Sequence, residues 1–209
     1  METNNYTFHE IFKGRENLVS QLKTAGYKTT SVENITADEL HYMHMHNDLD
    51  FKVEGGDKKA IVKYFLNKPI KAKAIQEMTS ELFDPENMFL PEKSVIILVV
   101  DSEPNTTLQD VVKQIFAEEK IHIIIYYLKR LQFNVLDHVM VPKHTILSEV
   151  DRASFIEKFN ISEDSNIPSI SRFDPVAQAV FMRPGEICKI ARASVNSIEG
   201  IYYRICVNV

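Results

Sequence analysis

The sequence predicts an α+β protein of two domains, residues 1–136 and 137–209, and three observations lead to this prediction. First, the apolar runs 95–100 and 123–128 have the length of buried strands and enclose a stretch with helical spacing, which is typical of a layered α/β unit. Second, Thr or Ser residues followed by an acid or amide three positions later mark several helix starts. Third, after Asp137 short strands alternate with polar turns, which predicts a small module of mixed helix and sheet.

The N-terminal domain begins with two capped helices. Thr7 and Glu10 have the spacing of a capping box, apolar residues follow at helical intervals, and Gly26 ends the pattern. Thr36 and Glu39 form a second box that starts a short helix. The elements expected next are a hairpin of 50–53 and 59–66 around Gly55-Gly56, a helix bearing Ile70, Ala74, Met78 and Leu82, a strand over 94–100, a helix behind a third capping box from Thr106 to Gln109, a strand over 121–127 and a last strand over 131–135.

The C-terminal module has about 70 residues, near the lower size at which a domain folds alone. A loop over 141–144 leads to Ser148, which opens an amphipathic helix together with Asp151. A polar segment, 160–169, follows. Short strands are then expected over 177–182, 187–193 and 201–207, separated by Pro184-Gly185 and by 194–200.

The charge distribution limits how the protein can contact nucleic acid. The net charge is −5. Residues 138–209 carry eight of the 24 basic and eight of the 29 acidic side chains, so the excess of acid lies in the first 137 residues. Tight binding to DNA by one chain normally needs a basic face, because phosphate neutralisation provides the affinity. Any DNA contact of this chain should therefore be local, weak and dependent on partners.

Composition and motifs exclude several classes of protein. No run of ~18 uncharged apolar residues occurs, so no contact with a membrane is expected. The polar, acidic start of the chain is not typical of a signal peptide. Two cysteines are too few for a disulfide framework or a four-ligand zinc site, which favours a reducing compartment. The sequence has no Gly-rich phosphate loop, Gly-x-Ser-x-Gly elbow or Cys-His arrangement, so no cofactor and no catalytic residue are expected.

One polar cluster raises the question of a metal site. His41, His44, His46, Asp48 and Asp50 carry ligands that a divalent metal accepts. In a strand, the last four would share one face, whereas a helix would pair only His41 with His44. The capping box at Thr36 starts a helix that should continue at least through His44. We therefore predict that the cluster is a polar helix end and binds no metal.

A second motif raises the question of a nuclease. Asp50-Phe51-Lys52, with Glu54 nearby, has the acid-x-lysine pattern in which carboxylates hold magnesium and lysine orients water. No second carboxylate from a neighbouring strand is evident in the sequence, and a pattern of three residues is common. A magnesium-dependent nuclease built on the N-terminal domain is nevertheless retained as an alternative.

The C-terminal module carries a series of dipeptides in fixed order. They are His138, Val141-Pro142-Lys143-His144, Ile167-Pro168, Asp174-Pro175-Val176-Ala177, Gly185 to Ile190, Arg192, Ser194 and Tyr203 to Cys206. Their order and spacing resemble the fifth subunit shared by eukaryotic RNA polymerases I, II and III, and its archaeal counterpart, which consists of this module alone. Large DNA viruses also encode versions. The resemblance covers about a third of the chain at high specificity, and the first 135 residues match more loosely, by the order and length of their elements.

The resemblance implies the fold and role of both domains. The N-terminal domain is expected to be a jaw with a nuclease-like α/β fold beside downstream DNA, and the C-terminal domain to be the assembly module. The implied protein is a non-catalytic subunit, one copy per complex, that docks on the largest polymerase subunit and contacts other subunits. Magnesium chemistry would belong to other chains. The expected location is the nucleus or, for a large DNA virus, the virion and the cytoplasmic factory of the host. A transcription-associated adaptor is the second alternative.

Departures from the family pattern put part of the docking surface in doubt. Ser169 and Gln178 stand where the family usually has arginine. A glycine common in the family is replaced by Val180 or Phe181, and a later glycine is displaced to Gly200. We therefore expect a partner surface that has diverged from the family.

Seven residues of the module are candidates for the subunit interface. Asp174-Pro175 is either a rigid corner offered to a partner or a turn required by the fold. Arginine forms bidentate bonds to carboxylates at interfaces, but solvated strand charges are the alternative. In a strand, Lys189 and Arg192 fall on opposite faces, and Arg204 shares its face with Tyr202. The candidates are Lys143, His144, Asp174, Pro175, Lys189, Arg192 and Arg204.

The candidate DNA contact is the turn Asn105-Thr106-Thr107. A helix N-terminus offers unpaired amides and the positive end of the helix dipole, so a phosphate oxygen can bind there without a lysine. The turn also lies where the family places a turn before a helix of the jaw. Simple helix capping is the alternative, and a contact through the DNA backbone alone is the expectation.

Overall fold

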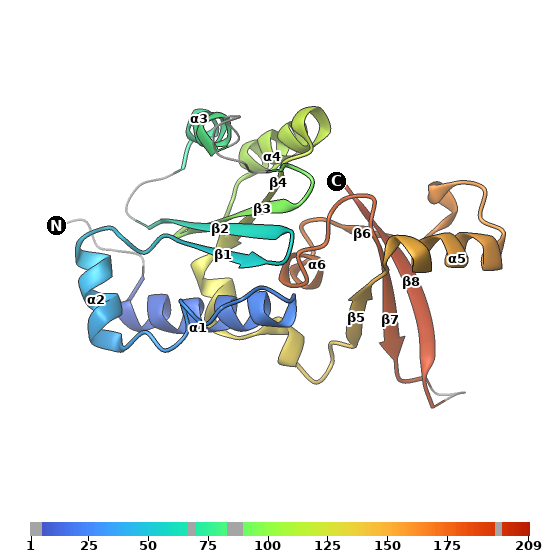
Figure 1. The fold of residues 1–209 in the computed structure, drawn as a ribbon, viewed down its shortest axis with the longest axis horizontal. Helices are drawn as coiled ribbons and strands as arrows, with labels where there is room; N and C mark the ends of the chain where they lie inside the picture. Colours follow the sequence, from blue (N-terminus) through green and yellow to red (C-terminus); the bar gives the residue numbers. More distant parts are fainter. Residues whose placement is uncertain (1–5, 67–69, 83–89, 195–197) are drawn as a thin grey trace. The chain divides into compact units, whose positions relative to one another are not determined.

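The computed structural model describes residues 6–66, 70–82, 90–194 and 198–209. They form two compact units, residues 1–134 and 135–209 (Figure 1). Each unit contains helices and one mixed sheet, which confirms the predicted α+β class. None of the helices in the described ranges is long and apolar enough to cross a membrane.

The sheet of the N-terminal unit has its strands in chain order. β1 (Phe51–Gly55) and β2 (Lys58–Phe65) form the predicted antiparallel hairpin. β2, β3 (Ser94–Val100) and β4 (His122–Tyr127) run parallel to one another. All seven residues of β3 are buried, which explains the continuous run of Val and Ile in this strand.

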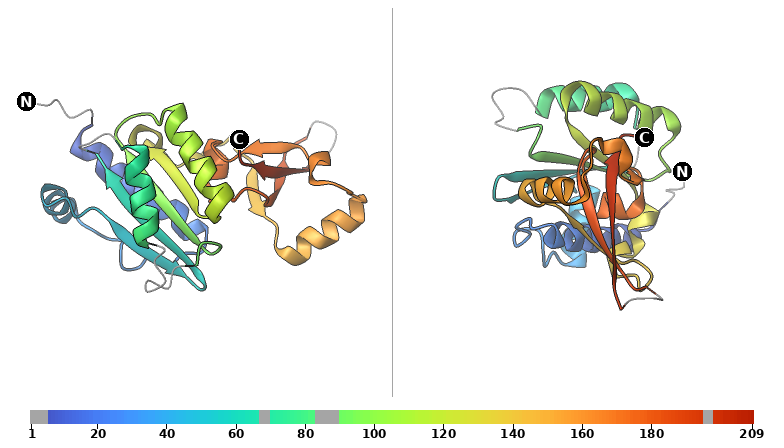
Figure 2. Two further views of the ribbon diagram at one scale, coloured as in Figure 1. Left: turned by 90° about the horizontal axis from the view of Figure 1, so that it is seen from above. Right: turned by 90° about the vertical axis from the view of Figure 1, so that its right-hand side faces the viewer.

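Helices cover both sides of this sheet. α3 (Ala72–Leu82) and α4 (Thr106–Glu119) lie on one side of it, and α1 (Phe8–Thr24) lies on the other (Figure 1, Figure 2). α2 (Ala37–Met45) follows α1 and buries only Leu40. The core between the sheet and the helices α3 and α4 consists of Ile75, Met78, Ile96, Leu98, Val100, Leu108, Val112, Ile115, Ile121, Ile123 and Ile125.

Side-chain caps set the starts of these helices. The boxes Thr7/Glu10 and Thr36/Glu39 form as predicted, each with the threonine and the glutamate bound to the other's backbone amide. The third box is wrong. α4 is capped by Asn105, whose side chain accepts a hydrogen bond from the Leu108 amide at 2.9 Å, and Thr106 is the first helical residue.

The strand predicted over 131–135 is wrong, because this segment forms the 3₁₀ helices η2 (Leu128–Gln132) and η3 (Val135–Asp137). η2 packs closely on α1. A Cβ added to Gly14 would lie 2.9 Å from Leu128 Cδ1. Side-chain hydrogen bonds also link the two helices, from Asn17 Nδ2 to the Leu131 carbonyl at 2.7 Å and from Gln132 Nε2 to the Glu10 carbonyl at 2.9 Å. Tertiary packing thus overrides the apolar pattern of this segment.

The sheet of the C-terminal unit has the strand order β5-β7-β8-β6. β5 (Lys143–Ile146), β7 (Ile187–Arg192) and β8 (Gly200–Val207) are antiparallel neighbours, and β6 (Ser169–Ser171) runs parallel to β8. One face packs against α5 (Glu149–Phe159) through Phe155, Ile167, Ile187 and Ile205. Cys188, Ile190 and Cys206 on the other face pack with Ala177 of α6 (Pro175–Ala179). A 3₁₀ turn, η4 (Asp164–Asn166), precedes β6.

Two predictions for this unit are wrong. The second half of the loop expected over 141–144 belongs to β5, because Lys143 and His144 pair with Ala191 and Ile190. The strand expected over 177–182 is replaced by α6 and the turn after it. The polar segment 160–169 contains η4 and leads into β6, which was not expected. The helix opened by Ser148 and the strands over 187–193 and 201–207 are confirmed within one residue.

Candidate functional site

The predicted DNA-contact turn is exposed at the N-terminus of α4. Asn105, Thr106 and Thr107 all lie on the surface. The Asn105 side-chain oxygen accepts a hydrogen bond from the Leu108 amide, and the Asn105 backbone carbonyl accepts one from the Gln109 amide at 3.2 Å. The amides of Thr106 and Thr107 belong to the first helical turn, where no carbonyl precedes them within the helix. Two N–H groups and the helix dipole are therefore directed at solvent.

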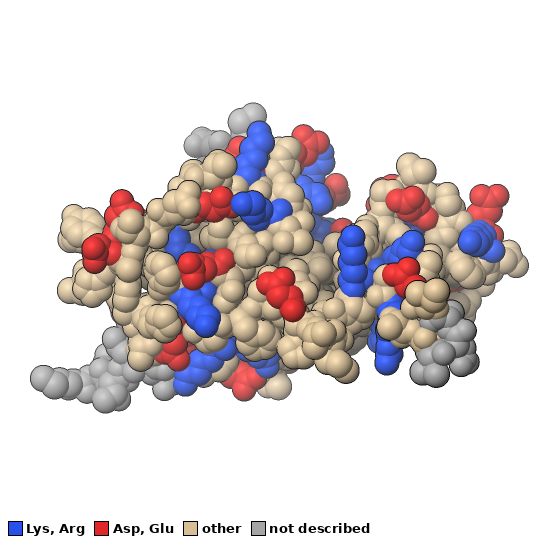
Figure 3. Space-filling view, turned by 90° about the horizontal axis from the view of Figure 1, so that it is seen from below, with Lys and Arg blue, Asp and Glu red and all other residues tan. Residues whose placement is uncertain are grey.

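The charges around this turn limit what it can bind. Glu103 lies two residues before the cap and pairs with Arg130, with 2.7 Å between Glu103 Oε1 and Arg130 Nη2. Asp110 lies in the next turn and pairs with Lys113 at 3.0 Å. Figure 3 draws the other side of the N-terminal sheet, which α1 covers, and there too basic and acidic side chains are interspersed. Sequence reasoning missed Arg130, which is 27 positions from Glu103 and reaches the turn only through the fold.

Asp174 and Pro175 start helix α6. The Asp174 carboxylate accepts hydrogen bonds from the amides of Val176 at 2.9 Å and Ala177 at 3.4 Å. Pro175 occupies the first helical position, where its fixed φ fits and its missing N–H leaves no gap, and it is exposed. The carboxylate thus has a structural task as a helix cap, whatever else it contacts.

The strand candidates divide between the two faces of the sheet. Directly opposite residues share a face, so the pairs Lys189↔Tyr203 and Lys143↔Ala191 place both lysines on the α5 side. His144, Arg192 and Arg204 lie on the α6 side, opposite Ile190, Gly200 and Cys188 respectively. This confirms the predicted opposite facing of Lys189 and Arg192, and the shared face of Arg204 and Tyr202. The four cations and the histidine therefore do not form one patch.

The environments of these side chains also differ. Arg192 and Arg204 are exposed, and one N–H of Arg204 donates to the Ser169 carbonyl at 2.9 Å. Lys189 is half-buried. His144 is half-buried too, and its Nδ1 lies 2.7 Å from the Pro142 carbonyl, so that nitrogen carries the proton. Salt bridges between described residues involve none of Lys143, Lys189, Arg192 and Arg204.

Sequence reasoning did not predict the exposure of two large side chains of β8, Ile201 and Tyr202. Ile201 is 51% exposed and Tyr202 is 49% exposed, on opposite faces of β8. The Tyr202 ring lies over Gly200, since a Cβ added there would be 3.2 Å from Tyr202 Cε2. Gly200 in turn pairs with Arg192. An alternating apolar pattern predicts the strand, but the exposure of these residues depends on which part of β8 the helices leave uncovered.

The histidine cluster is a helix end. α2 continues through Met45, and the His41 and His44 rings lie edge-on to Phe8 and Tyr6, at centroid distances of 5.0 and 6.0 Å. Burial lowers the pKa of His44, and His41 acts in the same direction. The described ranges contain no group of three potential metal ligands.

The acid-x-lysine motif is occupied by structural contacts. The Asp50 carboxylate accepts a hydrogen bond from the Tyr64 amide at 2.8 Å and so fastens the end of β2. Burial raises the pKa of Asp50, although that hydrogen bond opposes the shift. Glu54 pairs with Lys59 at 3.6 Å across the hairpin. The two carboxylates therefore serve the hairpin, and no neighbouring strand completes a magnesium site in the described ranges.

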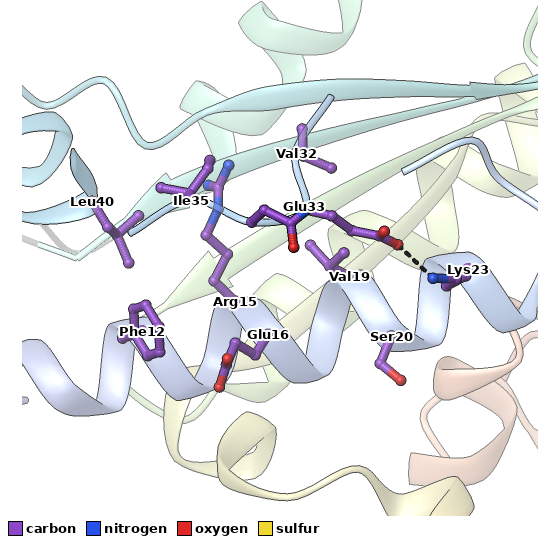
Figure 4. Close-up of a pocket in the computed structure, with 11 residues that line it drawn as sticks. Phe12, Arg15, Glu16, Val19, Ser20, Lys23, Val32, Glu33, Ile35 and Leu40 are labelled. Atoms are coloured by element: carbon purple, nitrogen blue, oxygen red, sulfur yellow. Dashed lines mark ion pairs between the residues drawn. The ribbon is translucent and has the colours of Figure 1, made fainter. Parts of the chain in front are cut away.

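A hollow of about 370 Å³ lies between α1 and the segment 32–35 (Figure 4). An ion pair between Lys23 and Glu33, 3.0 Å long, lies on one side of it. Glu16 points away from Glu33, so these two carboxylates do not converge on one point (Figure 4).

The buried cation beside this hollow is structural. Arg15 is 4% exposed, and it donates to the Leu49 carbonyl at 2.9 Å. Its guanidinium lies 4.3 Å from the centroid of the Phe51 ring, so it ties α1 to β1. Burial raises the pKa of Tyr64 to about 12, while Arg15 acts in the opposite direction.

Comparison with known proteins assigns the C-terminal unit. The family description "RNA polymerase Rpb5, C-terminal domain" matches residues 133–206. The DNA-directed RNA polymerase subunit Rpo5 of Pyrococcus abyssi is 38% identical over 76 residues, which are 36% of this chain and 92% of that protein. The Rpo5 subunit of Nitrosopumilus maritimus is 37% identical over 81 residues, 39% of this chain and 96% of that protein.

One similar protein extends over both units. The subunit 5B of DNA-directed RNA polymerases IV and V from Arabidopsis thaliana is 24% identical over 209 residues, covering 96% of this chain and 90% of that protein. The similarity to the plant subunit thus extends over most of both chains, whereas that to the archaeal proteins covers little more than a third of this chain.

Proposed function

Since the chain belongs to the family of the fifth subunit of DNA-directed RNA polymerases, we propose that it acts as a non-catalytic subunit of a multisubunit polymerase. The match of the family description to residues 133–206 carries this proposal, because it spans nearly the whole C-terminal unit. Catalysis belongs to other chains of the complex. Its location is that of the transcription machinery, the nucleus or, for a large DNA virus, the virion and the cytoplasmic factory.

The C-terminal unit docks on the largest subunit. Arg192 and Arg204 are exposed on one face of the sheet, and no salt bridge between described residues satisfies them. Guanidinium groups of this kind bind carboxylates through two parallel hydrogen bonds, which suits a stable interface. His144 lies on the same face as these arginines, whereas Lys143 and Lys189 lie on the α5 face and would contact a partner from that side. Pro175, exposed at the start of α6, adds a rigid corner.

The N-terminal unit helps to position downstream duplex DNA. The exposed first turn of α4 provides the amides of Thr106 and Thr107 for a phosphate oxygen. Glu103 and Asp110 beside the turn balance the charges of Arg130 and Lys113, so the turn has no excess of positive charge for phosphate and the contact is weak. A contact with the DNA backbone alone carries no sequence preference.

The two alternatives differ in their support. The similar proteins are polymerase subunits, and Asp50 and Glu54 have structural partners, so a nuclease is not supported. An adaptor that binds polymerase transiently shares the module but differs in stoichiometry. Recovery of one copy per polymerase from native extracts supports a subunit if the chain stays bound in about 0.5–1 M salt, a concentration that screens contacts between surface charges. Substoichiometric, salt-labile recovery supports the adaptor instead, and migration as a free chain refutes both.

The DNA contact is tested by adding one negative charge to the turn. Thr107→Glu places a carboxylate in the first turn of α4, where it stabilises the helix by about 0.3–1 kcal/mol but repels phosphate. We expect unchanged or raised thermal stability, unchanged recovery with polymerase, and weaker crosslinking of downstream DNA. The control Ala117→Glu adds the same charge near the other end of α4, at an exposed position. Equal crosslinking by Thr107→Glu and the wild-type chain refutes the contact.

A further inference from the structure

One edge of the C-terminal sheet is left without a neighbouring strand among the described residues. β6 pairs with the last residues of β8, Ile205 to Val207. The pairing ends at Pro168, whose carbonyl accepts a hydrogen bond from the Ile205 amide at 2.9 Å but which has no N–H to donate. In the described ranges, Gly200 to Arg204 therefore pair with β7 on one side and with no strand on the other (Figure 1).

The direction of the backbone groups on this edge follows from the ladder. The Cys206 amide donates to the Glu186 carbonyl on the β7 side, at 2.8 Å, while the Ile205 amide points the opposite way. Backbone groups alternate along a strand of an antiparallel pair. Ile201 and Tyr203 therefore direct their N–H and C=O groups outward, as Ile205 does. Such unpaired groups on a strand edge are a template for another strand.

The side chains beside this edge define what could add to it. On one face lies Ile201, half exposed. On the other lie Tyr202, Arg192 and Arg204, of which the two arginines take part in no ion pair between described residues. A strand added here would offer alternate side chains to the two faces. It should therefore carry an apolar residue on the Ile201 face and a carboxylate on the arginine face.

We infer that the outer edge of β8 at Ile201–Tyr203 receives an extended, acidic and apolar segment of a partner polymerase subunit, which adds to the sheet as a further strand. The inference rests on the proposed docking and names the chemistry of the partner. Main-chain hydrogen bonds provide affinity in this mode of recognition, and side-chain pockets provide specificity. A second copy of this chain fits the edge poorly, because pairing the two edges would bring arginines of both copies together.

The test removes one outward N–H and compares that change with loss of the side chain alone. Ile201→Pro deletes the outward donor but no hydrogen bond to β7, and proline is tolerated on an edge strand whose N–H faces solvent. Ile201→Ala keeps the donor and removes the apolar contact. We expect the free Ile201→Pro chain to unfold at the wild-type temperature and to be recovered with co-expressed polymerase at least tenfold less than Ile201→Ala.

Hydrogen exchange provides a second readout that does not depend on a variant. In the free wild-type chain the amides of Ile201 and Tyr203 should exchange quickly, and in the assembled polymerase they should be protected at least a hundredfold. The Tyr202 amide, directed at β7, serves as the internal control, because it is protected in both states. If Ile201→Pro fails to fold, this comparison decides alone.

The outcomes separate the two proposals. Two results overturn strand addition and leave docking intact. In one, the wild-type chain is recovered with polymerase but the amides of Ile201 and Tyr203 are not protected. In the other, Ile201→Pro is recovered as well as Ile201→Ala. Protection in a free dimer, seen by light scattering, overturns the partner in favour of a second copy. A wild-type chain that is not recovered with polymerase at all removes the proposed function itself.

Discussion

Replacing Asp174 separates the structural role of its carboxylate from a role in docking. The carboxylate accepts one good hydrogen bond, from the Val176 amide at 2.9 Å, and one at the limit of hydrogen-bond distance, from the Ala177 amide at 3.4 Å. Loss of a side-chain cap costs about 0.5–2 kcal/mol. We expect the upper half of this range for Asp174→Ala, because α6 is a single short helix whose Ala177 and Ala179 are almost fully buried.

The expected loss is therefore about 1–2 kcal/mol in the free energy of unfolding of the C-terminal unit. For a unit of this size it corresponds to a fall of about 4–16 °C in its melting temperature. Calorimetry on the full chain measures the loss as a downward shift of the transition that belongs to this unit. Asp174→Ser is the matched control, since serine caps helices about as well as aspartate but carries no charge.

The control decides between the two roles. If docking needs the carboxylate itself, Asp174→Ser melts like the wild-type chain but is recovered poorly with polymerase. If the residue acts only as a cap, Asp174→Ser restores both properties. An Asp174→Ala chain that melts within about 1 °C of the wild type would contradict the reasoning, since even the smallest cap effect exceeds this shift.

Three further predictions concern the stability of the isolated chain. Gly55→Ala should lower the free energy of unfolding of the N-terminal unit by about 1–3 kcal/mol, because the new Cβ would lie 2.7 Å from the Gly26 carbonyl oxygen. The control Gly56→Ala has open space around the new Cβ and only its φ of +63° against it, so it should cost only about 1 kcal/mol. Urea titrations measure both losses. Burial raises the pKa of Cys206 to about 12, so neither buried thiol should react with a disulfide reagent at pH 8 until the chain is unfolded, and reaction in the folded chain would contradict this burial. The hydrogen bond from the Thr7 backbone amide lowers the pKa of Glu10. The stability that the ionised carboxylate contributes is therefore present above the ordinary value of 4.5 and is lost as the pH falls through the lowered value. The stability difference between the wild type and Glu10→Gln should shrink steadily in acid titrations below pH 4.5, and a difference that stays constant would contradict this.

Helix starts and buried strands could be predicted because their signals are local. Thr7 and Thr36 each lie three positions before a glutamate, and both boxes form. The run 94–100 is apolar throughout because both faces of β3 are covered, so no choice between faces was needed. At α4 we predicted Thr106 as the cap, but the residue before it, Asn105, is the cap, since asparagine caps at least as well as threonine.

The wrong predictions arose where distant residues decide the local structure. The apolar residues around Leu131 suit a strand, but α1 offers them a surface at Gly14, and this segment packs there as a 3₁₀ helix. Ala177 to Met182 are apolar enough for a strand, but Asp174 and Pro175 impose a helix start. The short β5 is specified only by its partner β7, so its sequence alone resembles a loop.

The candidate site was predictable in part for the same reason. Spacing correctly separated Lys189 from Arg192, because alternation along a strand is a local property. The open edge beside Ile201 could not be predicted, since it depends on Pro168 ending the pairing of a strand some 30 residues away in sequence. The pairing of Arg130 with Glu103 likewise required the fold.

The charges of the chain make its two proposed contacts unequal. A turn flanked by Glu103 and Asp110, on a chain of net charge −5, cannot hold free DNA at useful concentrations. Tethering by the C-terminal unit changes this, because a flexibly or rigidly linked site experiences an effective concentration in the millimolar range. Docking thus comes first and the DNA contact depends on it. Loss of the Arg192 guanidinium or the Ile201→Pro change should therefore lower both polymerase recovery and DNA crosslinking at α4, whereas Thr107→Glu should reduce the crosslinking alone. Recovery that falls with Thr107→Glu would reverse this order.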